Sequence, residues 1–141
     1  MSVKQLDPTW SMYTIATAAG ATDFHYGDGG LTADCTQEAL DAAVAAYDHA
    51  AFVAAGKVKV FTELVQNHLN SVARESGYDD IFTAISYATS SHATRGPQGV
   101  AFRDWRDTVW DTCNVLLGTW QTGGTEPTLE EVLAALPTFT G

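Results

Sequence analysis

The sequence predicts a mainly helical α+β protein, in which a short N-terminal hairpin or extended segment precedes four to five helices. Near the N-terminus, residues alternate with the two-residue period of a strand. From residue 34 onward, apolar residues recur every three or four positions, as in helices that bury one face. The 141 residues, 45% of them hydrophobic, suffice for a real core. We therefore expect an extended segment, 1–33, and a helical domain, 34–141.

The N-terminal segment is predicted to be extended. Residues 10–17 alternate in the manner of a strand, and Phe24, His25 and Tyr26 form a second extended stretch. Ala19-Gly20-Ala21 is the expected chain reversal, and Gly27-Asp28-Gly29-Gly30 favours a turn. Because a two-stranded hairpin alone is marginal in water, this segment is expected to pack on the helices or to add to a partner's sheet.

Two helices are expected next. Thr36 or Asp34 caps a helix with an apolar stripe at Leu40, Val44, Tyr47 and Ala51. Gly56 weakens or ends it, and the sequence leaves open whether Gly56 divides two helices or only bends one. Residues 58–60 could also form a short strand. The following helix has an apolar side and is expected to end in a left-handed cap at Gly77; that side comprises Phe61, Leu64, Val65, His68, Leu69 and Val72.

The last third of the chain predicts three more helices. Asp79 or Asp80 caps a short helix over 81–87, and a loop follows to Gly99. The strongest helix spans about 100–121 and ends at Gly123-Gly124. Thr128 and Glu131 form a capping box that begins the final helix. The stripe of the strongest helix is Phe102, Trp105, Val109, Leu116 and Trp120, widened by Cys113 and Leu117.

Charge and hydropathy exclude two classes of partner. The sequence contains seven Lys and Arg residues and 17 Asp and Glu residues, which gives a formal net charge of −10. Nucleic-acid binding depends on Lys and Arg that neutralise phosphates, so no nucleic-acid partner is expected. No run approaches the roughly 18 apolar residues of a membrane helix, and no secretory signal is expected at the N-terminus.

Neither catalytic nor metal chemistry is expected. We predict that the chain is not an enzyme and that it holds no cofactor and no metal. The four histidines, at 25, 49, 68 and 92, lie far apart and form no short metal-binding repeat. The aspartates around the glycine-rich turn do not fit a calcium loop, and the paired carboxylates belong at helix starts. Cys35 and Cys113 are expected to be two buried thiols. The sequence leaves open whether a disulfide joins them.

Partner binding is the chemistry that the aromatic residues favour. Trp110 is rotated about 140° from Trp105 around the helix, so it faces away from the predicted stripe. Arg106 lies four residues earlier, and interfaces are enriched in Trp and Arg. We predict a binding pair of Trp110 and Arg106, with Trp10 and Tyr13 as N-terminal candidates. Packing of Trp110 under the loop 89–99 or against the final helix is the alternative.

Three motifs in the second half of the chain carry a resemblance to a known group: Gly77-Tyr78-Asp79-x-Ile81-x-Thr83-Ala84-x-Ser86-Tyr87-Ala88, Phe102-x-x-Trp105-Arg106-x-x-Val109-Trp110 and Pro127-Thr128-x-Glu130-Glu131-x-Leu133-x-x-Leu136-Pro137. In this order they resemble small proteins encoded beside tail-fibre genes of tailed bacteriophages, the tail-fibre assembly protein group. The resemblance covers about residues 65–137.

This resemblance implies a non-catalytic phage protein, made in the host cytoplasm and located in the virion tail, that binds a tail-fibre or baseplate protein. The alternative is a fibre assembly chaperone that is not retained in the virion. A homo-oligomer is also compatible with the sequence. A third hypothesis, from another class, is a small hydrolase or metal enzyme whose histidines converge in space. The sequence leaves open the partner, its stoichiometry, and whether the N-terminal segment pairs within the chain.

Overall fold

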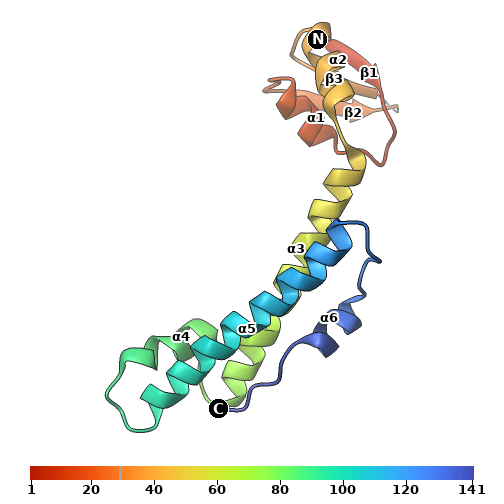
Figure 1. The fold of residues 1–141 in the computed structure, drawn as a ribbon. Coiled ribbons are helices and arrows are strands. Elements are labelled where there is room, and N and C mark those ends of the chain that lie inside the picture. The colour runs from red at the N-terminus through yellow and green to blue at the C-terminus, as the bar shows by residue number, and fades with distance from the viewer. Residues whose placement is uncertain (29) are drawn as a thin grey trace. The chain divides into compact units, whose positions relative to one another are not determined.

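In a computed structural model, which describes residues 1–28 and 30–141, the chain is mainly helical with a small three-stranded sheet (Figure 1). This confirms the predicted α+β, mainly α class. The chain consists of two compact units, residues 1–56 and residues 57–141. The division lies within helix α3, His49–Glu75, and therefore differs from the predicted boundary after residue 33. The observed boundary lies later than the predicted one because helix α2, Gln37–Ala46, contacts α1 and strand β1 and so belongs to the first unit.

The sheet of the first unit consists of β1, Ser2–Gln5, β2, Phe24–Gly27, and β3, Gly30–Ala33. The strands are antiparallel in the order β1-β3-β2, with Gly27 opposite Gly30. Gly29, part of the predicted turn, lies outside the described residues. Strand β1 was not predicted; it adds a third strand within the chain to a hairpin that would be marginal alone.

Helix α1, Met12–Ala18, occupies the segment predicted as a strand, so that prediction is wrong. The Ser11 hydroxyl accepts a hydrogen bond from the Thr14 N–H at 3.3 Å and caps the helix. Ile15 and Ala16 are fully buried, which is a helical and not an alternating pattern. Threonine and alanine give little contrast in polarity between the two sides of a strand, so the alternation was a weak signal.

The predicted reversal at Ala19-Gly20-Ala21 is instead the end of α1. Gly20 has φ +77°, and the N–H groups of Gly20 and Ala21 donate to the carbonyls of Thr17 and Ala16 at 3.0 Å. These two bonds define a Schellman cap. The hairpin therefore turns later, between Gly27 and Gly30.

Helix α2 begins as predicted at Thr36, whose hydroxyl accepts from the Ala39 N–H at 3.2 Å. It ends at Tyr47, whose backbone is extended, so the prediction that this helix continues to Ala51 is wrong. The Asp48 carboxylate accepts from the Ala51 N–H at 2.9 Å at the start of α3. Gly56 lies inside α3, and residues 58–60 are helical. A capping side chain decides the break here, because a mid-helix glycine costs only about 1 kcal/mol.

A hydrogen-bonded aspartate holds the loop before β2 next to the end of β3. The backbone N–H and the hydroxyl of Thr22 donate to the Asp34 carboxylate at 2.8 and 2.7 Å. The hydrogen bond from the Thr22 side chain is the main cause that lowers the pKa of Asp34 below its ordinary value, because it stabilises the ionised carboxylate. This bond helps to close the first unit around its core, which includes Ile15, Leu31 and Leu40.

The second unit consists of the later part of α3 with α4, Ile81–Ser86, the 3₁₀ turn η1, Tyr87–Thr89, α5, Arg95–Gln121, and α6, Leu129–Ala135. Figure 1 shows α5 running alongside α3. Five members of the predicted stripe of α5 are buried, including Cys113 and Leu117, whereas Leu116 and Trp120 are only half-buried. The buried side chains of the two helices are Phe61, Val65, Leu69 and Ala73 of α3 and Phe102, Trp105, Val109, Cys113 and Leu117 of α5.

Local caps in this unit are confirmed. Gly77 has φ +87°, and the Tyr78 N–H donates to the Ala73 carbonyl at 3.1 Å, which ends α3. The Asp80 carboxylate accepts from the Thr83 N–H at 2.7 Å at the start of α4. At the start of α6, the Thr128 N–H donates to the Glu131 carboxylate at 2.8 Å and the Glu131 N–H to the Thr128 hydroxyl at 3.1 Å.

Helix α5 begins at Arg95, earlier than predicted, so the expected loop over 96–99 is wrong. Pro97 lies in the first turn, where N–H groups lack partners inside the helix. Gly96 and Gly99 are buried. A Cβ on Gly99 would lie 2.5 Å from the Ala88 nitrogen and 2.7 Å from the Tyr87 carbonyl carbon. The two glycines therefore allow the backbone of α5 to approach that of η1.

We expect Gly99→Ala to destabilise the second unit by about 1–3 kcal/mol, because the new methyl group meets backbone atoms that cannot rotate away. Gly118→Ala is the matched control in the same helix. In the described part of the chain, a Cβ at position 118 meets nothing within 4 Å, so this variant should gain roughly 0.5–1 kcal/mol from helix propensity. Urea unfolding followed by tryptophan fluorescence measures both; equal effects of the two substitutions would contradict the close approach.

Candidate functional site

An apolar groove opens in the first unit, and we call it the α1/α2 groove. Its volume is about 300 Å³, and it is lined by Thr14, Ile15, Ala18, Ala43, Ala46, Tyr47, Asp48 and Phe52. Three of the lining side chains are alanines, which leave space between the two helices. Two aromatic rings and one carboxylate complete it. The groove can therefore accept an apolar side chain beside a negative charge.

The Tyr47 ring of the groove is held in place by neighbours in the same unit. Its hydroxyl accepts a hydrogen bond from the Ser11 N–H at 2.9 Å. The ring centroids of Trp10 and Tyr47 lie 5.2 Å apart, and those of Tyr47 and Phe52 lie 6.1 Å apart. Trp10, predicted as a partner-binding residue, thus supports a wall of the groove but does not line it.

Tyr13, the second N-terminal candidate, is 69% exposed and lies on α1 next to the groove residue Thr14. Its ring packs edge-on against Phe24 of β2 with centroids 6.0 Å apart. Phe52 and Val53 add exposed apolar surface, at 45% and 38%. The first unit therefore presents several large apolar side chains to solvent around the groove and on α1.

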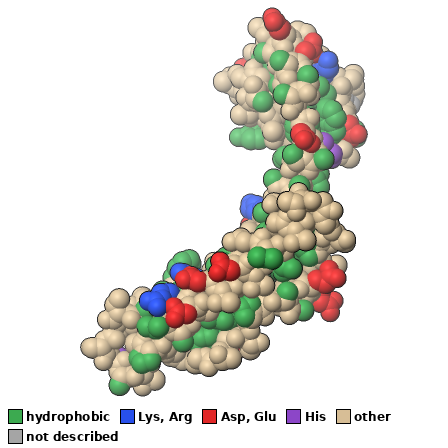
Figure 2. Space-filling model, in the orientation of Figure 1, with side chains coloured by type: hydrophobic (Ala, Val, Ile, Leu, Met, Phe, Trp, Pro, Cys, Tyr) green, Lys and Arg blue, Asp and Glu red, His purple; other side chains and the backbone are tan. Residues whose placement is uncertain are grey.

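The first unit is also acidic. It contains seven aspartate and glutamate residues and one lysine. That lysine, Lys4, lies 2.8 Å from the Asp41 carboxylate. Acidic side chains are scattered over the visible face of this unit (Figure 2). Its field therefore favours basic ligands and repels acidic ones.

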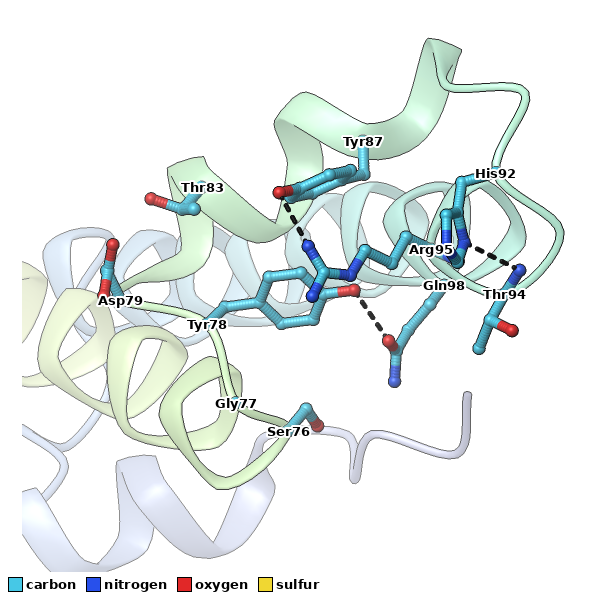
Figure 3. A pocket seen from close by; sticks show the side chains of 10 residues that line it. All are labelled: Ser76, Gly77, Tyr78, Asp79, Thr83, Tyr87, His92, Thr94, Arg95 and Gln98. Carbon is cyan, nitrogen blue, oxygen red and sulfur yellow. Dashed lines mark hydrogen bonds between the residues drawn. The ribbon is translucent and has the colours of Figure 1, made fainter.

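A second, polar pocket lies in the second unit, between the end of α3, α4 and the start of α5 (Figure 3). Its volume is about 460 Å³. The Arg95 guanidinium lies 5.1 Å from the centre of the Tyr87 ring and donates to the Tyr87 hydroxyl at 3.0 Å. The Tyr78 hydroxyl donates to the Gln98 side-chain oxygen at 2.7 Å. These polar groups satisfy one another, and their hydrogen bonds join η1 and the loop after α3 to the start of α5.

His92 is exposed, and it has a structural role in this pocket. Its Nδ1 accepts hydrogen bonds from the backbone N–H groups of Thr94 and Arg95 at 3.3 and 3.1 Å. The ring therefore caps the start of α5, which explains how this helix begins at Arg95. His68 of α3 is half-buried, and its ring centroid lies 5.9 Å from that of Trp105.

Trp110 and Arg106, the predicted binding pair, have different environments. Trp110 is half-buried and packs against the core of the second unit. The Arg106 guanidinium donates to the neighbouring Asp107 carboxylate at 2.8 and 3.0 Å. One part of the Trp110 side chain thus packs on the core and the rest is exposed. Its role in binding a partner stays a prediction.

Metal-ligating and thiol groups are dispersed. Within 1–28 and 30–141, no three His, Cys, Asp or Glu side chains are placed to hold a metal ion. Cys35 is half-buried, Cys113 is buried, and both are free thiols. Burial raises the pKa of the Cys113 thiol, because it disfavours the charged thiolate. Among the described helices, none is long and apolar enough to cross a membrane.

Comparisons with protein-family models, with curated proteins and with solved structures gave no match to the chain. The candidate site therefore rests on geometry alone. Sequence reasoning found Trp10 and Tyr13 beside the groove but missed its alanines. Their signal, small residues on the facing sides of two helices, becomes visible only once α1 is assigned as a helix.

The two tryptophans of α5 should differ in their contribution to stability. Trp105 is 8% exposed, and its Nε1 donates to the Pro137 carbonyl at 2.7 Å. We expect Trp105→Ala to cost about 3–5 kcal/mol of unfolding free energy. Trp110→Ala should cost only about 1–2 kcal/mol, because less of its surface is buried. Urea unfolding measures both, and an equal loss would place Trp110 wholly in the core.

Proposed function

We propose that this chain is a non-catalytic bacteriophage tail protein that binds a tail-fibre or baseplate component as a structural or attachment part of the virion. The observation that carries the proposal is the position of the residues that resemble the tail-fibre assembly group. Most of their apolar members are buried in the core of the second unit: Tyr78, Ile81, Ala84, Phe102, Trp105, Val109 and Leu136. Thr128 and Glu131 of the third motif form the capping box. The resemblance therefore extends over one folding unit.

The first unit supports the binding part of the proposal. Its core is built from other residues, among them Ile15, Leu31 and Leu40. It adds an apolar groove and exposed aromatic side chains, which are typical of surfaces that bind proteins. On this proposal, the second unit carries the residues that resemble the tail-fibre assembly group, and the first unit supplies a partner-specific surface.

A tail-fibre assembly chaperone is the alternative, since the same surface serves either role. The two roles differ in whether the chain stays in the particle. A chaperone leaves after the fibre has assembled, whereas an attachment component remains in fixed stoichiometry.

Quantitative mass spectrometry of purified particles, scored against the major tail proteins, tests the proposal. We expect a fixed copy number in small-integer ratio to a fibre or baseplate protein. Absence from particles, together with abundance beside the fibre protein in infected-cell lysate, would make the chain a chaperone. If the chain associates with tail proteins in neither sample, the proposal is wrong.

A further inference from the structure

We infer that the α1/α2 groove binds a short partner segment in which one large apolar side chain lies next to lysine or arginine. This inference rests on the proposed function, because it names the chemistry of the segment that the tail partner would present. It concerns only residues of the first unit, and it makes the groove, rather than Trp110, the principal anchor point.

The size of the groove suits a side chain. At about 300 Å³, it lies at the lower end of the range for small-molecule sites, and its alanines leave room for one leucine- or phenylalanine-sized group. Binding hot spots are commonly such pockets filled by one anchor residue. Neither a large cofactor nor a whole helix fits this volume.

The walls of the groove are fixed before any ligand binds. The Ser11 N–H holds the Tyr47 hydroxyl at 2.9 Å, and Trp10 packs on the same ring. The Asp48 carboxylate is held by the Ala51 N–H at 2.9 Å. Because these groups are already ordered, an anchor side chain entering the groove meets a lower entropic cost of binding.

Charge determines which partner is favoured. Asp48 lines the groove, and the unit around it has seven acidic residues against one lysine, which is already paired with Asp41. A segment with lysine or arginine beside its anchor is attracted by this field. A second copy of this acidic unit is repelled by it, so the occupant that fits is another, basic protein.

Groove-filling variants test the inference. Ala46 is exposed at the end of α2 and lines the groove, so Ala46→Leu places a side chain in the space while keeping a strong helix former. Ala45→Leu is the matched control, because Ala45 is exposed on the same helix and does not line the groove. Asp48→Asn removes the charge and retains a helix-capping side chain.

The probes are three fluorescent peptides of equal length, one of leucine and lysine, one of alanine and lysine, and one of leucine and glutamate. Fluorescence anisotropy with the full chain should show binding of the leucine–lysine peptide alone. Ala46→Leu should weaken it at least about 10-fold and Asp48→Asn about 3-fold, whereas Ala45→Leu should change it less than about 2-fold. Circular dichroism checks that each variant is folded.

Three results would overturn the inference. The first is that no peptide binds, and the second is that Ala46→Leu and Ala45→Leu bind the leucine–lysine peptide equally. The third is self-association in sedimentation that Ala46→Leu abolishes, since a second copy would then occupy the groove. If the chain is nevertheless present in particles at fixed copy number, the proposed function stands and another surface makes the contact.

Discussion

The close approach between α5 and η1 is the constraint on which the second unit depends. Gly99 has no side chain, so the backbone of Tyr87 and Ala88 comes within van der Waals contact of the helix. In the preceding turn of the same helix, the Arg95 guanidinium lies over the Tyr87 ring. From there the stripe that contains Phe102 and Trp105 continues along α5 into the core shared with α3. Because interiors are close-packed, even one added methyl group at this point must displace backbone atoms of η1.

The C-terminal residues complete that core. The rings of Phe139 and Phe102 are stacked with centroids 4.0 Å apart, and Trp105 bonds to the Pro137 carbonyl. Residues after α6 are thus part of the packing, and the apolar side of α5 is covered by α3 on one part and by this segment on another. The rings of Phe102, Trp105 and Phe139 are therefore used in packing within the second unit.

The first unit has a separate, smaller core that is built from other residues. Its sheet has only three short strands, and a short helix, α1, lies against α2 in one small core. Alanines on both helices leave the groove, while Ser11 and Tyr47 fix its walls. Because each unit has its own core, we expect substitutions at the groove to leave the core of the second unit undisturbed.

Local signals were predictable, and tertiary ones were not. The caps at Thr36, Asp80 and Thr128 and the glycine at 77 were found because side-chain capping acts over three or four residues. Helix α1 was missed because it is short and rich in threonine and alanine, and β1 because only its pairing with β3 makes it a strand. The groove was missed for the same reason: it exists only between two packed helices.

Photo-crosslinking in infected cells tests the central claim most directly. A benzophenone amino acid replaces Phe52, which lines the groove and is 45% exposed, or Phe82, which is 63% exposed on α4 of the second unit. The account predicts a cross-link from position 52 to one tail-fibre or baseplate protein, and little or none from position 82. A cross-link from position 82 alone, or equal cross-linking from both, would contradict it.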